Sequence, residues 1–340
     1  MKQVEFIDKN GAFRIHNPEN YSGLYLPLAG ETGLKSSITP NLGGDSKTDQ
    51  NHFLLEPVSI ENLHNNRNTR NFWCRIEDKG CWSVCGSSAK QEAEKFTKDQ
   101  DESTLEAGFM WQKLTRISKE YGVKAETTSF VTLDGAMEVM MVEITNTAEY
   151  EQKITPMAVI PVYGRSADNI RDHRHVTSLL HRIETKMYGV EVCPVLSFDE
   201  RGHQKNQTTY FVYGSTGEGE APETFYPTTK MFIGEGGSYL KPETVRTVKD
   251  GVPAGTKLQG KEAAGGMRFA SVTLKPQESA AYLILAGISE EREQIEKQTA
   301  AYRTKKQVEA ALETVKKHWT DKVNVDFATG DTAVDNYLKW

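Results

Sequence analysis

Residues 125–146, AETTSFVTLDGAMEVMMVEITN, form two runs rich in β-branched and apolar residues on either side of Asp134-Gly135. Asp-Gly is typical of tight hairpin turns, because both residues tolerate the positive φ that such turns require. Each run has the length and composition of a strand. The stretch therefore predicts an antiparallel hairpin of two strands, 125–133 and 136–146.

The same signals recur outward from this hairpin. Strand-like segments, bounded by Gly, Asn, Asp and Pro, occur at 154–163, 208–214, 267–274 and 280–287. A succession of strands without helices between them favours antiparallel packing over a parallel α/β sheet. The chain is therefore predicted to be mainly β, with a large antiparallel β-sandwich in residues 1–287.

The pattern changes near Ser289, where helix-forming residues take over. Apolar side chains recur there at the spacing of one helical face: Val308, Ala311, Leu312, Val315 and Trp319. We expect a helical linker at 288–326. A fresh amphipathic pattern, TAVDNYLKW, begins at Thr332, and we expect the chain to be the front portion of a longer protein.

Composition excludes several classes of protein. The 340 residues carry a net charge of -6, whereas nucleic-acid binders are usually basic, so we expect no nucleic-acid partner. No apolar run is long enough for a membrane helix, and the start of the chain lacks a signal peptide, so we expect a cytoplasmic protein without a membrane partner. The four cysteines lack paired C-x-x-C spacing, which argues against a metal site and a disulfide framework.

The segment GRSADNIRDHRHVTSLLHRI, 164–183, concentrates arginine and histidine in an acidic chain. Clustered arginines repel one another unless anionic groups gather them. A phosphate, a carboxylate surface of a partner, or Asp168 and Asp172 themselves would fill that need. A zinc site from His173, His175 and His181 is disfavoured because arginines flank them, and no G-x-S-x-G motif supports a serine triad.

Two polar loops are further candidates for ligand contact. Segments 38–57 and 63–74 hold amide, acidic and aromatic side chains that suit sugar hydroxyls and ring faces, although any polar loop contains such residues.

The segment GTKLQGKE, 255–262, has the spacing of a phosphate loop. Glu262, however, stands where Ser or Thr would bind magnesium.

Four segments together resemble the amino-terminal region of glycoside phosphorylases of the cellobiose-phosphorylase type, glycoside hydrolase family 94. They are FRIHNPENYSGLYLPLAGETGLKSSITPNLGGD (13–45), LHNNRNTRNFWC (63–74), AETTSFVTLDGAMEVMMVEITNT (125–147) and 164–183. The resemblance implies a galactose-mutarotase-like super-sandwich, two linker helices and an (α/α)6 catalytic barrel. Residues 327–340 would then be the start of that barrel.

The resemblance also implies a reaction, namely inverting phosphorolysis of a β-glucosidic bond that releases α-glucose 1-phosphate. A carboxylic acid protonates the leaving oxygen while inorganic phosphate, the co-substrate, attacks from the opposite face. The resemblance implies no cofactor, places the acid beyond Trp340, and gives the sandwich roles in barrel packing, homodimer formation and the active-site rim. The substrate would be a β-glucan oligosaccharide or disaccharide.

Mapped onto this chain, the resemblance makes part of 164–183 the first candidate for a rim or interface loop: Arg165, Asp168, Asn169, Arg171, Asp172, Arg174 and His175. Second candidates are Asp45, Asn51, Asn65, Arg67 and Arg70. Two other functions stay open. One is a stand-alone carbohydrate-binding sandwich, and the other is a complete lyase or hydrolase that uses Arg174, His175 and Tyr163.

Overall fold

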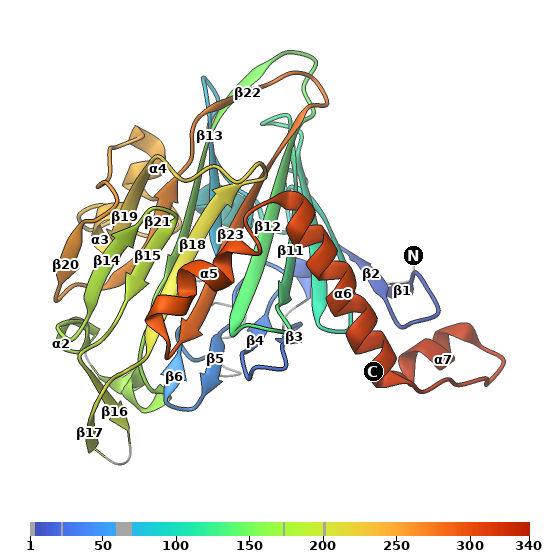
Figure 1. Ribbon diagram of the computed structural model, residues 1–340. Coiled ribbons are helices and arrows are strands. Elements are labelled where there is room, and N and C mark those ends of the chain that lie inside the picture. The colour runs from blue at the N-terminus through green and yellow to red at the C-terminus, as the bar shows by residue number, and fades with distance from the viewer. Residues whose placement is uncertain (1–3, 22, 59–69, 173, 200–201) are drawn as a thin grey trace.

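The computed structural model describes residues 4–21, 23–58, 70–172, 174–199 and 202–340, and it is built around two antiparallel sheets packed face to face (Figure 1). Within these residues the larger sheet has 11 strands. In spatial order they are β1 (Val4–Phe6), β2 (Phe13–His16), β9 (Glu102–Gly108), β10 (Trp111–Ser118), β11 (Val123–Val131), β12 (Met137–Asn146), β23 (Ser279–Ser289), β18 (Thr209–Thr216), β15 (Gly189–Val192), β14 (Arg182–Lys186) and β20 (Lys257–Gln259).

The second sheet lies behind the first. Its strands in order are β19 (Thr224–Thr228), β21 (Ala263–Arg268), β13 (Gln152–Pro161), β7 (Asn71–Ile76) and β8 (Gly80–Ser83), and β22 (Val272–Leu274) also pairs with β13. Two smaller sheets flank the sandwich: β3 (Leu26–Ala29), β4 (Lys35–Ile38), β5 (Ser46–Asp49) and β6 (His52–Phe53), and the hairpin of β16 (Leu196–Asp199) and β17 (Gly202–Lys205). The predicted large antiparallel β-sandwich is confirmed.

The main hydrophobic core fills the space between the two large sheets. Strands alternate their side chains between two faces, and the inward-facing residues from both sheets, such as Val142, Ile284 and Ile160, form one buried cluster. Gly265 on β21 lets the sheets approach closely, because a Cβ there would lie 2.2 Å from the side chain of Val212 on β18. Packing this close leaves no room for an added side-chain atom at this position.

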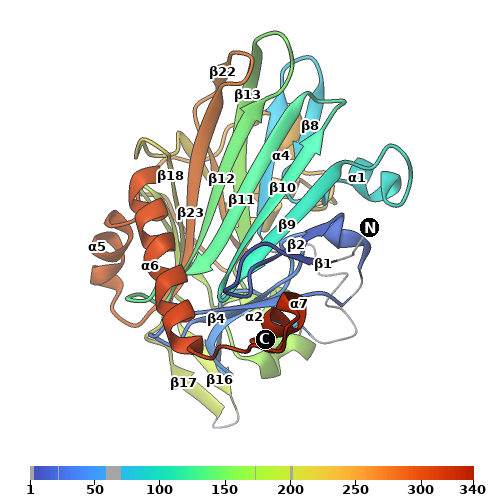
Figure 2. The same ribbon diagram turned by 90° about the vertical axis from the view of Figure 1, so that its right-hand side faces the viewer.

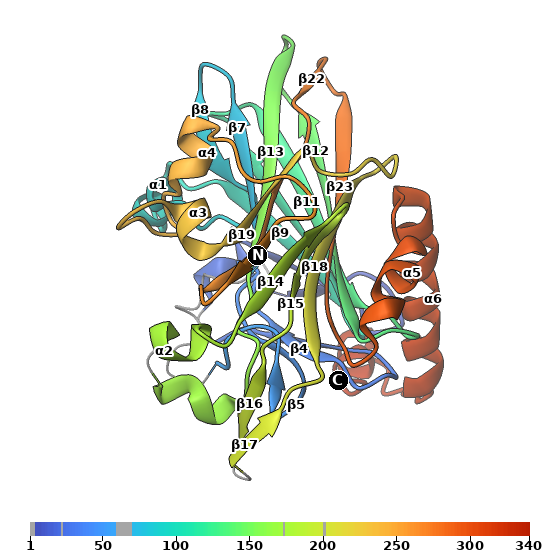
Figure 3. The same ribbon diagram turned by 60° about the vertical axis from the view of Figure 1, so that its left-hand side comes forward.

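Helices cover the outer faces (Figure 3). α5 (Ile295–Ala300) and α6 (Lys305–Val323) lie on the outer face of the larger sheet, where Val308, Leu312 and Val315 are buried and Ala311 and Trp319 pack beside them. The predicted helical face is therefore confirmed. α3 (Thr229–Ile233) and α4 (Glu243–Thr247) cover the second sheet. The remaining helical segments are η1 (Pro18–Asn20), α1 (Ala89–Glu94), η2 (Ala167–Arg171), α2 (Arg174–Ser178), η3 (Arg292–Gln294) and α7 (Thr332–Tyr337).

α7 returns to the beginning of the chain (Figure 2). The Gly11 amide donates to Asn336 Oδ1 over 3.0 Å, and Trp340 Nε1 donates to the Gly11 carbonyl over 2.8 Å. The Trp340 ring lies 5.4 Å from the ring of Phe13 and 4.9 Å from that of Phe109. The 11–13 segment therefore holds the end of the described chain in place.

Two details of the predicted strands differ from the structure. β11 and β12 pair as predicted, but neither Asp134 nor Gly135 has positive φ, because the loop extends from Leu133 to Ala136 and is closed by the Thr132 amide donating to the Met137 carbonyl over 3.0 Å. The predicted strand 267–274 is divided into β21 and β22. Pro156 of β13 lies opposite this break. Its carbonyl accepts from the Phe269 amide over 3.0 Å, but it has no N–H to donate in return, and the register has shifted by one residue where pairing resumes at Val272.

None of the helices in the described ranges combines the length and hydropathy needed to cross a membrane.

Candidate functional site

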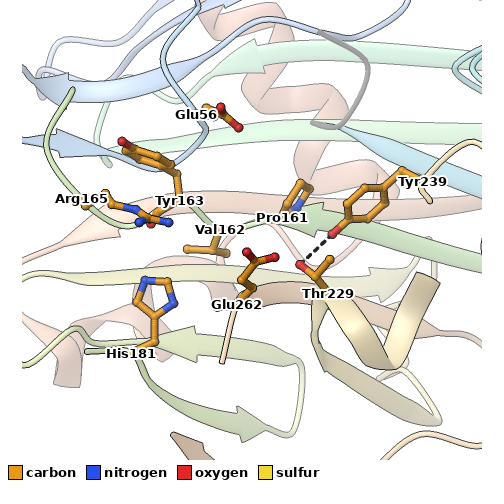
Figure 4. Close-up of a pocket in the computed structure, with 10 residues that line it drawn as sticks. Glu56, Pro161, Val162, Tyr163, Arg165, His181, Thr229, Tyr239 and Glu262 are labelled. Atoms are coloured by element: carbon orange, nitrogen blue, oxygen red, sulfur yellow. Dashed lines mark hydrogen bonds between the residues drawn. The ribbon is translucent and has the colours of Figure 1, made fainter. Parts of the chain in front are cut away.

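A polar cleft opens where the end of β13 meets the first residues of the 164–183 segment (Figure 4). The volume open to the centre of a water molecule is about 60 Å³, enough for a few ordered waters or a small ion. The cleft is lined by Glu56, Pro161, Val162, Tyr163, Arg165, His181, Thr229, Tyr239, Glu262 and Ala263. Seven of these ten side chains carry polar atoms, so the cleft is suited to polar or charged ligands.

Segments far apart in the sequence build this cleft. Gly164 and Arg165 pair with Phe53, since the Gly164 amide donates to the Phe53 carbonyl and the Phe53 amide donates to the Arg165 carbonyl, each over 3.0 Å. Gly164 has a φ of 65°, which is a left-handed conformation that glycine adopts readily. The chain therefore turns sharply after Tyr163 and directs Arg165 into the cleft.

Arg165 is the buried cation of the cleft. Its Nε donates to the Tyr163 carbonyl over 3.2 Å, and its guanidinium carbon lies 4.4 Å from the centre of the Tyr163 ring. Among the described residues, Nη1 is buried without a hydrogen-bond partner, and no carboxylate forms an ion pair with this side chain. Burial lowers the pKa of Arg165, opposed in part by the nearby Tyr163, Glu262 and Asp172. The side chain therefore has an N–H available for an added acceptor.

His181 lies beside this arginine as a neutral imidazole. Burial, and secondarily the charge of Arg165, lower the pKa of His181 to about 4. Nδ1 is 3.1 Å from the Lys261 carbonyl oxygen, which accepts only, so this hydrogen bond forms when the ring carries its proton on Nδ1. Burial likewise raises the pKa of Tyr163 to about 12. Both groups are therefore uncharged near neutral pH.

The opposite wall carries hydroxyl and carboxylate groups. Thr229 Oγ1 and the Tyr239 hydroxyl are 3.1 Å apart, and Figure 4 shows the Glu262 carboxylate between them and His181. Together with Glu56 they supply hydrogen-bonding groups of both kinds. Such an arrangement can bind sugar hydroxyls, or an anion held by Arg165. In the described ranges no group of three or more His, Cys, Asp or Glu side chains is placed to hold a metal ion.

The structure brings together only part of the first candidate set. Arg165 lies in the cleft, whereas Asp168 and Asp172 are exposed beside it. Asn169 is buried, its Nδ2 donates to Asp172 Oδ2 over 2.9 Å, and its Oδ1 has no partner among the described residues. The side chains of Arg171, Arg174 and His175 lie outside the described residues.

The second candidates have different surroundings. Arg70 is buried and uses all five N–H groups, on the Glu138 carboxylate and on the carbonyls of Leu42, Gly43 and Asp45. The Asp45 carboxylate accepts from the Ser37 hydroxyl over 2.8 Å, and Asn51 Oδ1 accepts from the Ser166 hydroxyl over 3.4 Å. Asn65 and Arg67 lie outside the described residues. Arg70 therefore stabilises the fold, and Asn51 braces the candidate loop.

Sequence reasoning did not find most of the cleft. Glu56, His181, Thr229, Tyr239 and Glu262 belong to five separate segments. No motif links them, and the phosphate-loop spacing around Glu262 does not point to this cleft. His181 lies in the 164–183 segment and Glu56 in the polar 38–57 segment, and these two segments are the available signals.

Comparison with known proteins supports the fold. The family model described as "Glycosyl hydrolase 94, supersandwich domain" matches residues 32–305. A bacterial glucoamylase solved with acarbose has a similar structure, with a TM-score of 0.53 at 5% identity, over 100% of this chain and 43% of that one. No curated protein matches the sequence.

Two further solved structures have lower TM-scores. A putative kojibiose phosphorylase from the human microbiome has a TM-score of 0.40 at 9% identity, over 98% of this chain and 38% of that one. A GalM/aldose epimerase homologue from C. elegans has a TM-score of 0.41 at 10% identity, over 78% and 98%. The chain thus spans less than half the length of the glucoamylase and of the putative phosphorylase. Since the family model covers most of the sequence, the chain belongs to glycosyl hydrolase family 94, through its super-sandwich domain.

Proposed function

We propose that the chain is the non-catalytic N-terminal part of an inverting glycoside phosphorylase, which cleaves β-glucosidic bonds with inorganic phosphate to give α-glucose 1-phosphate. The observation that carries this proposal is the match of residues 32–305 to the super-sandwich domain of family 94. In the proposal this part packs on a catalytic barrel, contributes to a homodimer and supplies the rim of the active site. Substrates are β-gluco-oligosaccharides or disaccharides, and the protein acts in the cytoplasm.

The proposed chemistry assigns no catalytic residue to this chain. An inverting phosphorolysis needs a carboxylic acid on the leaving oxygen and cations around the attacking phosphate. Asp168 and Asp172 are exposed, so neither lies in the desolvated surroundings that raise the pKa of a general acid. The acid is therefore expected in the barrel, beyond Trp340.

The cleft supports a positioning role at the rim. Arg165 is desolvated yet has a free Nη1, while Glu56, Glu262, Thr229 and Tyr239 offer further polar groups within the same cleft. A buried guanidinium with a donor to spare gains most from an oxygen supplied from outside, either by a ligand or by a docked domain. Arg165 is the residue most suited to meet substrate, phosphate or barrel.

The test compares this chain with the longer polypeptide from the same reading frame. Each is incubated with phosphate and β-1,2-, β-1,3- or β-1,4-linked gluco-oligosaccharides, and glucose 1-phosphate is measured. We expect product from the longer polypeptide only, and an Arg165→Met change there should raise the KM for phosphate or sugar. Phosphorolysis by this chain alone would contradict a non-catalytic role.

The alternative of a stand-alone carbohydrate-binding module is separated by calorimetry. The cleft is small, about 60 Å³, compared with the several hundred Å³ of typical ligand pockets, which favours a part that works when assembled. Tight binding of β-gluco-oligosaccharides by this chain alone would favour the module instead. Turnover by this chain without phosphate would favour the lyase or hydrolase that uses Arg174, His175 and Tyr163.

A further inference from the structure

A second and larger cleft lies at the β7–β8 edge of the second sheet, beside α4 and the segment that precedes it. Figure 3 shows α4 next to β7 and β8. Its volume is about 420 Å³, which is the size of a small-molecule pocket. It is lined by Trp73, Arg75, Gly80, Cys81, Ser88, Ala89, Lys90, Leu240, Lys241, Pro242 and Arg246. No acidic residue is among them.

Most of the cationic side chains that line this cleft have no carboxylate partner in the described part of the chain. Lys90 forms ion pairs with Glu94 and Glu120. Arg75, Lys241 and Arg246, in contrast, form no ion pair within the described ranges, although Arg75 Nη1 donates to the Ile76 carbonyl over 2.7 Å. Arg75 is half-buried, whereas Lys241 and Arg246 are exposed. An anion bound in the cleft would lower the repulsion among these three charges.

The Cys81 thiol lines the same cleft as the two guanidinium groups. Burial raises the pKa of Cys81, and the charges of Arg75 and Arg246 oppose that rise. The thiol therefore lies within electrostatic reach of both arginines, although one comes from β7 and the other from α4. An anion beside Cys81 would be in reach of the same two groups.

Part of the remaining lining is apolar. Leu240 and Pro242 form one wall, and Trp73 is fully buried with its Nε1 lacking a hydrogen-bond partner in the described part of the chain. Inorganic phosphate alone would leave most of a 420 Å³ space unfilled. A ligand with an organic group would instead cover this apolar wall.

We propose that this cleft binds a small organic phosphate, with the phosphate dianion among Arg75, Lys241 and Arg246 and the organic group against Leu240 and Pro242. Two negative charges match three free cations better than the single charge of a carboxylate, and the planar fork of arginine suits phosphate oxygens. The site is separate from the Arg165 cleft and does not depend on the proposed phosphorolysis.

Calorimetry on the chain tests the proposal with four probes: phenyl phosphate, glucose 1-phosphate, inorganic phosphate and glucose. We expect saturable binding of at least one organic phosphate at one site per chain, at least tenfold tighter than inorganic phosphate, and none of glucose. Preference between phenyl phosphate and glucose 1-phosphate identifies the organic group. Equal affinity for inorganic phosphate and both organic phosphates would overturn the proposal, as would the absence of saturable binding.

Variants locate the binding site. Arg246→Met should weaken binding at least tenfold, and so should Ala89→Trp, which fills the cleft from an exposed position without changing charge. Lys317→Met removes an exposed cation from α6 on the other side of the molecule and should leave binding unchanged. Unchanged melting temperatures establish that each variant is folded. Binding that survives both Arg246→Met and Ala89→Trp would contradict this location.

Thiol alkylation gives a readout that needs no variant. Cys81 is half-buried in the cleft, Cys193 is half-buried elsewhere, and Cys74 and Cys85 are buried. Saturating organic phosphate should slow the reaction of Cys81 with N-ethylmaleimide at least fivefold, measured by peptide mass spectrometry, and leave the rate at Cys193 unchanged. Equal rates at Cys81 with and without ligand would count against the proposal.

Discussion

Arg70 and Glu138 form a bidentate ion pair in the interior of the sandwich, with Arg70 Nη2 2.8 Å from Glu138 Oε2. The same carboxylate accepts from the Ser36 hydroxyl over 2.6 Å. Glu138 belongs to β12 of the larger sheet, Ser36 belongs to β4, and Arg70 directly precedes β7 of the second sheet. One buried ion pair therefore links the larger sheet, the second sheet and the small sheet that contains β4.

Arg70→Met should destabilise the chain by about 3–5 kcal/mol, because it leaves the Glu138 carboxylate buried without its cation. The free energy of unfolding from urea titration measures this cost. The double variant with Glu138→Gln should recover part of the loss, since the uncompensated charge is then gone. A cost below about 1 kcal/mol for Arg70→Met would show that water reaches the pair.

Arg165→Met tests the opposite case, a buried arginine whose removal should cost little stability. Arg165 is also buried, but one guanidinium nitrogen has no partner and no ion pair forms within the described ranges. Removing an incompletely satisfied cation costs little, because its desolvation penalty disappears with it. We expect the free energy of unfolding to change by less than about 1 kcal/mol. A loss as large as that of Arg70→Met would mean that Arg165 serves the fold.

His181 should make stability depend on pH. Its pKa falls from 6.5 to about 4 on folding, so between these values the unfolded chain binds a proton that the folded chain does not. The resulting stability is present above pH 6.5 and is lost as the pH falls toward 4, by up to about 3 kcal/mol.

The comparison of His181→Gln with the unaltered chain isolates this effect. The variant should lose less stability than the unaltered chain when urea titrations are repeated from pH 7 to pH 4.5, because glutamine does not titrate. NMR titration of the His181 ring should give a pKa below 5. Parallel pH profiles for the two proteins would contradict the assignment.

Gly265→Ala should destabilise the chain by about 1–3 kcal/mol, because the added Cβ would meet Val212 of the facing sheet at 2.2 Å. Gly135→Ala is the control. Its Cβ would meet only the Thr132 hydroxyl oxygen, at 3.4 Å, and its φ is not positive. We expect that change to be neutral or stabilising by up to about 1 kcal/mol, which melting curves will show.

Local sequence determined several of the strands and the helical face. The β11–β12 hairpin and the buried stripe of α6 follow from periodicity, because the spacing of apolar residues sets which face of a strand or helix is buried. The order of strands in the sheets could not be read in this way. β12 pairs with β23, from which it is separated by more than a hundred residues, and such long-range pairing leaves no local signal.

By itself the sequence determined that the chain is mainly β and that the 164–183 segment concentrates cations. Only the tertiary structure decided which cation is available. Arg70 and Arg165 are the same residue type and both are buried, but the fold surrounds Arg70 with five acceptors and leaves Arg165 with a free N–H beside Glu262 and His181. The physical reason is that hydrogen-bond satisfaction depends on groups brought from distant segments, which no local pattern encodes.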